Sequence, residues 1–71
     1  MVIENPQELG KEIRKRRKDL KYTQAFLSEF SGLSVSFISD LEGGKPTAEI
    51  GKILELMNLL GMDLEIRVRG R

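Results

Sequence analysis

TQAFLSEFSGLSVSFISDLE, residues 23–42, is the stretch from which the rest of the fold follows. It is typical of two short helices joined by a tight turn at residues 31–33. Thr23 and Ser34 are each placed to cap a helix, because a hydroxyl there can accept a hydrogen bond from a first-turn N–H that has no partner within the helix. Gly32 stands where the first helix must stop, and we expect a left-handed backbone there.

The apolar residues of this stretch separate its inner surface from its outer surface. Leu27 falls on the inner side of the first helix, and Ile38 and Leu41 lie three apart on the inner side of the second. Helices this short cannot bury enough surface alone, so we expect the flanking helices to form their base. The positions left exposed on the second helix are Ser34, Val35, Ser36 and Ser39.

The pattern TQ-x-x-L-x-x-x-x-G-x-S-x-x-x-I-S-x-L-E-x-G-K resembles the helix-turn-helix of the Cro/C1-type (XRE) repressors. The similarity extends over roughly residues 9–61, and caps, turn glycine and core positions all fall in register. Residues 37–64 are further similar to the HipB-type antitoxin subgroup, small repressors that pair with a HipA-type kinase toxin. The matching residues are Thr23, Gln24, Leu27, Gly32, Ser34, Ile38, Ser39, Leu41, Glu42, Gly44 and Lys45.

This resemblance implies a double-stranded DNA site. The second helix would enter the major groove with its N-terminal turn, while Gln24 and Lys45 would meet phosphates. The alternative for Gln24 is a solvated first-turn residue. The serines and Val35 of the second helix can touch base edges. That helix holds no Arg or Gln to make a bidentate base contact, so we expect modest specificity that relies on DNA shape. The expected DNA-binding residues are Thr23, Gln24, Ser34, Val35, Ser36, Ser39 and Lys45.

Bulk composition narrows the class of protein. The chain has 71 residues, and we expect one domain, residues 1–71, with a helical DNA-binding body at 5–61 and a dimerising strand at 62–69. A chain this small buries only about 60% of its unfolded surface, so oligomerisation is a common remedy. There is no cysteine and no histidine. We therefore expect no enzyme, no metal and no cofactor.

Location follows from what the sequence does not contain. No apolar run approaches the roughly 20 residues of a membrane span, so we expect no membrane contact. MVIENPQ, residues 1–7, has no basic region followed by an apolar one, so no signal peptide is expected. The absence of cysteine is compatible with a reducing compartment, and we expect a cytoplasmic protein.

The charges are unevenly distributed although the net charge is only +1. Residues 11–21 are mainly basic, and residues 40–65 are mainly acidic. A solvated charged helix is the plainer interpretation of the basic segment. Beside a helix-turn-helix, contact with phosphate is favoured instead.

A first helix is expected from Pro6 to about Leu20, with Asn5 as its N-cap and Glu8 in a capping box. Leu9, Ile13 and Leu20 form its apolar stripe, and Arg17 falls on the same stripe. Burying that charge alone is costly, so we expect a structural ion pair between Arg17 and Glu42, which the resemblance also implies. The alternative is that Arg17 reaches outward to a phosphate or to water.

Phe26 and Phe30 depart from the family pattern, because relatives usually place polar residues there. Paired exposed aromatic side chains suggest a partner-binding surface. Packing on the C-terminal segment is an equally weighted alternative.

A fourth helix is expected from a cap at Thr47 to Leu60. Its apolar residues occupy well over half of its circumference, although a surface helix needs an apolar stripe only about 100° wide. The surplus suggests that Leu56, Leu59 and Leu60 face a second subunit.

Residues 62–69, MDLEIRVR, alternate apolar and charged side chains without exception, which predicts a half-buried strand. A lone strand leaves backbone groups unpaired, so its expected partner is the same strand of a second copy. Centring the antiparallel pair on Ile66 places opposite charges across from each other. The resemblance to HipB implies such an exchanged strand, and the alternative is a frayed tail. The dimer interface would then comprise Leu56, Leu59, Leu60, Met62, Leu64, Ile66 and Val68.

The expected fold is therefore an all-α, four-helix Cro/C1-type domain with a C-terminal β-strand paired across a two-fold dimer. Three functions are open. The first is a dimeric, autoregulating repressor of a near-palindromic operator that is also the antitoxin of a HipA-type kinase, where the toxin follows from resemblance alone. The second is a stand-alone regulator without a toxin. The third is a protein-interaction module that has lost DNA binding.

Overall fold

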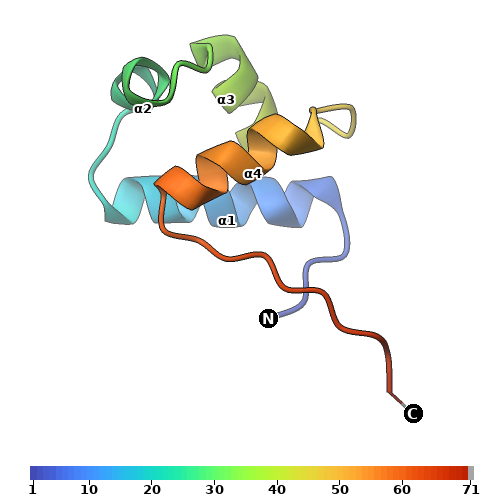
Figure 1. The fold of residues 1–71 in the computed structure, drawn as a ribbon. Helices are drawn as coiled ribbons and strands as arrows, with labels where there is room; N and C mark the ends of the chain where they lie inside the picture. Colours follow the sequence, from blue (N-terminus) through green and yellow to red (C-terminus); the bar gives the residue numbers. More distant parts are fainter. Residues whose placement is uncertain (71) are drawn as a thin grey trace.

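The computed structural model describes residues 1–70, and this part of the chain contains four α-helices. They are α1 (Pro6–Asp19), α2 (Gln24–Ser31), α3 (Val35–Glu42) and α4 (Ile50–Leu59). In Figure 1, α2 and α3 lie together on one side of the body, and α4 lies across α1 on the other. Arg71, the last residue of the expected domain, lies outside the described residues.

The starts of α1, α2 and α3 follow the sequence closely. Asn5 Oδ1 accepts from the Glu8 N–H at 2.8 Å, and the hydroxyls of Thr23 and Ser34 accept from first-turn N–H groups at 3.0 Å each. Gly32 ends α2 with φ +79°, as its position predicted. The carboxylate of Glu8 accepts from the N–H of Glu4 at 2.8 Å, one residue before the N-cap.

The start of α4 differs from the prediction. Thr47 does not cap this helix, because α4 begins three residues later at Ile50, with Glu49 in the N-cap position and no side-chain cap bond. Residues 43–49 form the connection from α3 to α4. Thr47 is a residue type that favours an N-cap, but α4 does not begin there.

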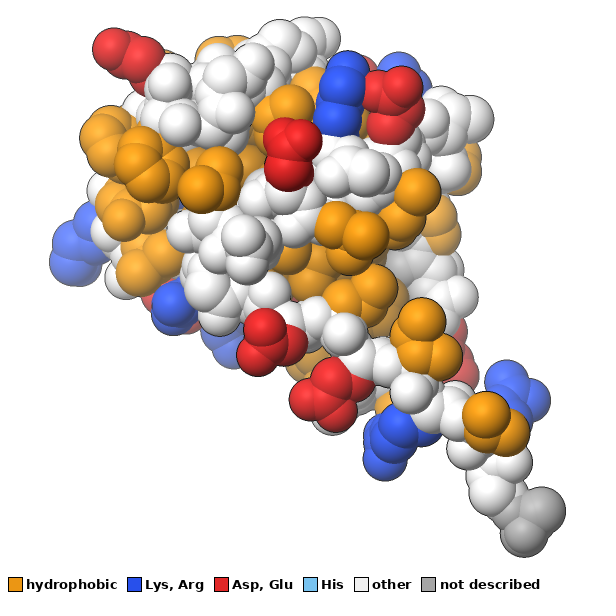
Figure 2. All heavy atoms as spheres, viewed as in Figure 1, with side chains coloured by type: hydrophobic (Ala, Val, Ile, Leu, Met, Phe, Trp, Pro, Cys, Tyr) orange, Lys and Arg blue, Asp and Glu red, His pale blue; other side chains and the backbone are white. Residues whose placement is uncertain are grey.

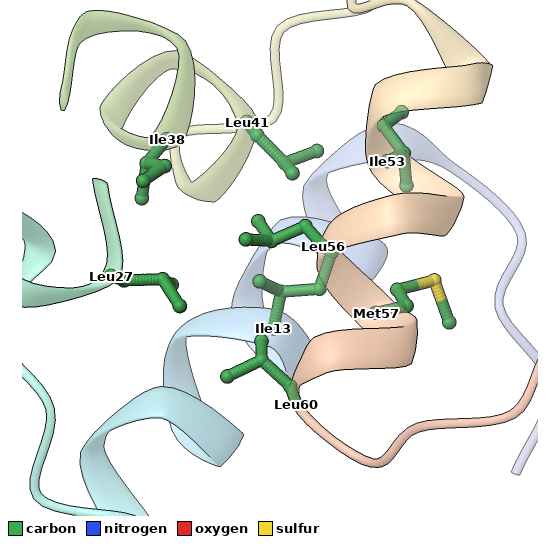
Figure 3. Close-up of a cluster of buried hydrophobic side chains, with 8 residues drawn as sticks. All are labelled: Ile13, Leu27, Ile38, Leu41, Ile53, Leu56, Met57 and Leu60. Atoms are coloured by element: carbon green, nitrogen blue, oxygen red, sulfur yellow. The ribbon is translucent and has the colours of Figure 1, made fainter. Parts of the chain in front are cut away.

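The core is formed by side chains from all four helices (Figure 3). Gly10 lets α1 approach α3 closely, because a Cβ at this position would lie 2.4 Å from the carbonyl oxygen of Leu41. The buried hydrophobic residues are Ile13, Leu27, Ile38, Leu41, Ile53, Leu56, Met57 and Leu60.

Two residues of the expected dimer interface belong to this core. Leu56 is 0% and Leu60 is 1% exposed, so neither offers area to a second subunit. The apolar surplus of α4 indicated that a second surface exists, but it did not indicate which side of the helix that surface occupies. The large apolar side chains that α4 leaves exposed are Ile50, Leu54 and Leu59.

The segment that follows α4 extends away from the body (Figure 1). Arg16 Nε donates to the carbonyl oxygen of Leu60 at 2.7 Å, and Gly61 then turns the chain with φ +71°. Met62 packs against the core, whereas Ile66 and Val68 are 89% and 94% exposed.

The predicted strand at residues 62–69 is absent from the single chain, where residues 1–70 contain no β-strand. A strand is defined by hydrogen bonds to a neighbouring strand, and one copy of this segment has no neighbour to supply them. The single chain is therefore all-α. None of the helices described within residues 1–70 is long and apolar enough to cross a membrane.

Candidate nucleic-acid interface

Two helix N-termini carry most of the predicted DNA-binding residues. Thr23 and Gln24 start α2, while Ser34, Val35 and Ser36 start α3. The capping bonds use the oxygen acceptors of Thr23 and Ser34, so each hydroxyl hydrogen remains available as a donor. Both termini carry the partial positive charge of a helix dipole, which favours an anionic ligand such as phosphate.

The turn between α2 and α3 is held by hydrogen bonds from side chains. Ser28 Oγ donates to the carbonyl oxygen of Leu33 at 2.6 Å, and the Leu33 N–H donates to Ser31 Oγ at 3.1 Å. Ser28 therefore joins the body of α2 to Leu33, the residue before the N-cap of α3. These bonds fix the direction in which the first turn of α3 projects.

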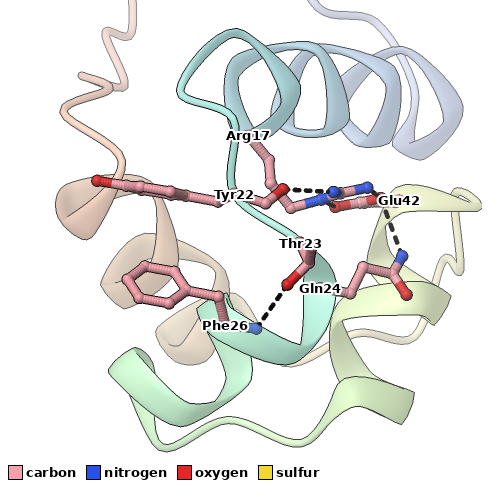
Figure 4. A network of polar contacts seen from close by, with 6 residues as sticks. All are labelled: Arg17, Tyr22, Thr23, Gln24, Phe26 and Glu42. Carbon is pink, nitrogen blue, oxygen red and sulfur yellow. Dashed lines mark hydrogen bonds and ion pairs between the residues drawn. The ribbon is translucent and has the colours of Figure 1, made fainter.

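The predicted pair of Arg17 and Glu42 connects this unit to α1 (Figure 4). Arg17 Nε and Nη2 donate to Oε2 and Oε1 of Glu42 at 2.6 and 2.9 Å, which is bidentate geometry. Arg17 Nη1 also donates to the carbonyl oxygen of Tyr22 at 2.8 Å. The Arg17 and Glu42 side chains are only 8% and 4% exposed. Both the sequence pattern and the resemblance pointed to this pair.

Each charge of this pair holds the other in its ionised form. The hydrogen bonding of the Arg17 guanidinium to the Glu42 carboxylate, which accepts, raises the pKa of Arg17 against the opposing effect of burial. Burial alone would raise the pKa of Glu42, but hydrogen bonds from Arg17 and Gln24, with the charges of Arg17 and Arg14, hold it below its ordinary value. The pair therefore remains ionised at neutral pH.

Gln24 has a second task that the sequence did not reveal. Its Nε2 donates to Glu42 Oε1 at 3.1 Å, and the side chain is half-buried. A contact between this amide and a phosphate would therefore use the remaining N–H of the same nitrogen. A further donor to Glu42 could have been expected from the sequence, because a carboxylate accepts about four hydrogen bonds and Arg17 supplies only two of them.

The other predicted contact residues lie on the surface. Val35 is 43% exposed, and the remaining residues are also exposed: Thr23, Ser34, Ser36, Ser39 and Lys45. Lys45 Nζ lies 3.4 Å from Asp40 Oδ2 in an exposed pair, which contributes little and leaves the ammonium group able to turn to another anion. Within residues 1–70, no cluster of potential metal ligands is present.

Capped helices joined by a left-handed glycine, with an exposed first turn on the second helix, define a helix-turn-helix. The sequence model described as Helix-turn-helix matches residues 13–66. The chain belongs to the helix-turn-helix family. The resemblance seen in the sequence is thereby confirmed at the level of the family.

This helix-turn-helix chain is 40% identical over 68 residues to a protein of Sinorhizobium fredii (strain NBRC 101917 / NGR234), described as uncharacterized HTH-type transcriptional regulator y4mF. The alignment covers 96% of this chain and 90% of that protein. The chain is thus a helix-turn-helix transcriptional regulator, a DNA-binding and non-enzymatic class.

Solved structures share the fold at much lower identity. The HipB–O4 20mer complex matches with a TM-score of 0.87 and 17% identity, and covers 99% of both chains. The HipA–HipB–O2–O3 complex matches with a TM-score of 0.88 and 17% identity, again over 99% of both chains. At these identities the likeness concerns the fold.

Proposed function

We propose that this regulator is a homodimeric, sequence-specific repressor formed by one domain, residues 1–71. Residues 5–61 are its DNA-binding body, and residues 62–69 are its dimerising strand. The observation that carries the proposal is the segment after α4, whose apolar side chains at Leu64, Ile66 and Val68 are 51%, 89% and 94% exposed. Apolar side chains that alternate on an extended segment favour pairing with a second strand.

Charge selects the register of that pairing. With Ile66 facing its own symmetry mate, Leu64 faces Val68, Glu65 faces Arg67, and the next pair outward is also of opposite sign. Each opposite-charge pair contributes about 0.2–1 kcal/mol across an antiparallel pair, whereas like charges destabilise it. Centring on Glu65 or Arg67 would oppose like charges, so the Ile66 register is favoured.

A second apolar surface supports the same dimer. Figure 2 shows hydrophobic side chains on the α4 side of the body and again along the C-terminal segment. Ile50 and Leu54, one helical turn apart on α4, are 62% and 42% exposed. We place these residues, with Leu59 and Met62, beside the paired strands; Leu56 and Leu60 support them from the core.

Two-fold pairing would present two α3 helices to one face of DNA. Their half-sites would lie one helical turn apart, roughly 34 Å, on a near-palindromic operator. The residues proposed to contact DNA remain Thr23, Gln24, Ser34, Val35, Ser36, Ser39 and Lys45. Because the first turn of α3 holds no long polar side chain, most of the affinity would come from phosphates.

We further propose that this regulator binds a HipA-type kinase toxin. Similarity of residues 37–64 to HipB-type antitoxins, together with the fold shared with HipB in a complex with HipA, supports a HipA-type kinase partner. A stand-alone regulator is the second candidate. It is favoured by the 40% identical relative, which is described only as a transcriptional regulator.

A mobility-shift titration with the DNA upstream of its own gene, repeated across a salt series, tests DNA binding. Ser36→Glu places a carboxylate at the exposed start of α3 and should weaken binding at least about tenfold. Asn58→Glu makes the same kind of change at an exposed position of α4 and should leave the affinity near wild type. Absence of any shift would favour the interaction module without DNA binding. Equal effects of the two substitutions would contradict the role proposed for the first turn of α3. Co-purification with the product of the adjacent gene separates the antitoxin from the stand-alone regulator.

A further inference from the structure

Three aromatic rings form a ladder along one edge of α2. The ring centroids of Tyr22 and Phe26 lie 4.9 Å apart, and those of Phe26 and Phe30 lie 6.0 Å apart in a stacked arrangement. Phe26 is 49% and Phe30 is 58% exposed, so the core takes up neither side chain. Large aromatic side chains held in this way are typical anchors of protein interfaces. We name Tyr22, Phe26 and Phe30 the aromatic face.

The aromatic face lies away from the recognition helix. Gln24 and Ser28, one turn apart on α2, bond to Glu42 at the end of α3 and to Leu33 just before it. They therefore mark the edge of α2 that faces α3. Phe26 is two residues from each, which places it about 200° around the helix on the opposite edge. A molecule bound there would leave the first turn of α3 accessible.

Positive charge borders this face. Lys18, in the last turn of α1, and Lys21, the residue directly before Tyr22, are both exposed. The Lys21 N–H donates to the Lys18 carbonyl oxygen at 2.9 Å, and Lys21 has φ +63°, so the chain is held in a tight turn here. Figure 2 shows hydrophobic side chains gathered beside α2, with basic side chains below them. The surface is thus apolar, with a basic rim at and just after the end of α1 formed by Lys18 and Lys21, while Asp19 and Glu29 are the exposed acidic residues nearest to it in the sequence.

We propose that the aromatic face and its rim bind a protein segment that presents apolar side chains flanked by Asp or Glu. The rings would take up the apolar side chains, and the two lysines would meet the carboxylates. A second copy of this chain is a poorer occupant, because symmetric pairing of the face would bring the lysine rims together. The face shares no residue with the proposed dimer interface or with the residues proposed to contact DNA, so a substitution in the face leaves the residues of both other surfaces unchanged.

The experiment pans a random-peptide phage library on the full-length protein and measures the best peptide by fluorescence anisotropy. Phe26→Gln with Phe30→Gln removes the rings but keeps good helix formers. Lys18→Glu with Lys21→Glu reverses the rim at exposed positions and leaves the rings in place. Val2→Gln is the matched control, because Val2 is an exposed apolar residue outside the face. Circular dichroism verifies that each variant is folded.

Selected peptides should combine apolar and acidic residues. Their affinity should fall at least about tenfold in the double phenylalanine variant, as is common when interface anchors are truncated, and about three- to tenfold in the lysine variant. The control variant should bind the peptide within about twofold of the wild type. No enrichment, peptides without acidic residues, or equal binding by the lysine variant would each overturn the proposal. A loss of DNA binding alone would leave it standing.

Discussion

Replacing Glu42 by glutamine changes one atom of the buried pair and removes its negative charge. Both carboxylate oxygens hold Arg17, at 2.6 and 2.9 Å, and one of them also accepts from Gln24. Glutamine keeps one acceptor and turns the other into a donor, which then faces a guanidinium N–H. The Arg17 side chain, 8% exposed, would retain its charge without a counter-ion.

Breaking a buried pair in this way typically costs about 3–5 kcal/mol. Because the amide can still accept one hydrogen bond, we expect the lower end of this range, about 3 kcal/mol. At about 4–8 °C per kcal/mol for a domain of this size, the melting temperature should fall by about 12–24 °C. Replacing both Arg17 and Glu42 by methionine should cost much less, because no unpaired charge remains.

Thermal unfolding followed by circular dichroism, at one fixed protein concentration, measures this loss. Glu29→Gln, on the exposed surface of α2, is the control and should change stability by less than about 0.5 kcal/mol. The pKa of Glu42 is lower in the folded chain than its ordinary value of 4.5. The contribution of the Glu42 carboxylate to the free energy of unfolding is therefore complete above pH 4.5. It is lost as the pH falls through the pKa that Glu42 has in the folded chain. The Glu42→Gln variant should lack this component. If Glu42→Gln behaves like Glu29→Gln, the pair is not desolvated and its assigned role fails.

Two further substitutions test packing and capping. Gly10→Ala should destabilise the protein by about 1–3 kcal/mol, because the new Cβ would lie 2.4 Å from a carbonyl oxygen of α3. Gly51→Ala meets no atom within 4 Å and should stabilise α4 by about 0.5–1 kcal/mol; urea unfolding that gave both changes the same sign would refute the close approach. Ser34→Ala removes the cap bond to the Phe37 N–H and should cost about 1 kcal/mol. Ser34→Asp should restore the melting temperature, because aspartate also caps helices. It should still weaken DNA binding in a mobility-shift titration, because it adds a negative charge at the start of α3. Unchanged DNA binding would contradict a contact between the start of α3 and DNA.

The sequence predicted the structure correctly where a residue and its partner are near in sequence. It also did so where one arrangement of a side chain has a much lower free energy than the alternatives. Asn5, Thr23 and Ser34 cap helices because a cap needs only the next three residues. Arg17 on an apolar stripe could hardly be buried without a carboxylate, so Glu42 could be predicted across 25 residues.

The errors arise where the outcome depends on how elements are packed. The apolar residues of α4 indicated that two apolar surfaces exist. Only the packing of the four helices decides that Leu56 and Leu60 face the core. The close approach of α3 to Gly10 was not predicted, because nothing in the local sequence shows that another backbone passes close to this residue. The prediction that Thr47 caps α4 was wrong, because the connection continues to Glu49 before α4 begins. The strand at residues 62–69 is not one of these errors, because it was predicted to pair across a dimer and a single copy does not test that pairing.

The dimer itself is tested most directly by sedimentation equilibrium of the full-length protein beside its Ile66→Asp variant. Burying two facing aspartates at the centre of the strand pair would be costly, so the substitution should separate the subunits without unfolding the helices. The wild type should sediment at twice the 8.1 kDa of one chain, and the variant at 8.1 kDa. A wild type of one copy, or a variant that remains paired, would contradict dimerisation through residues 62–69.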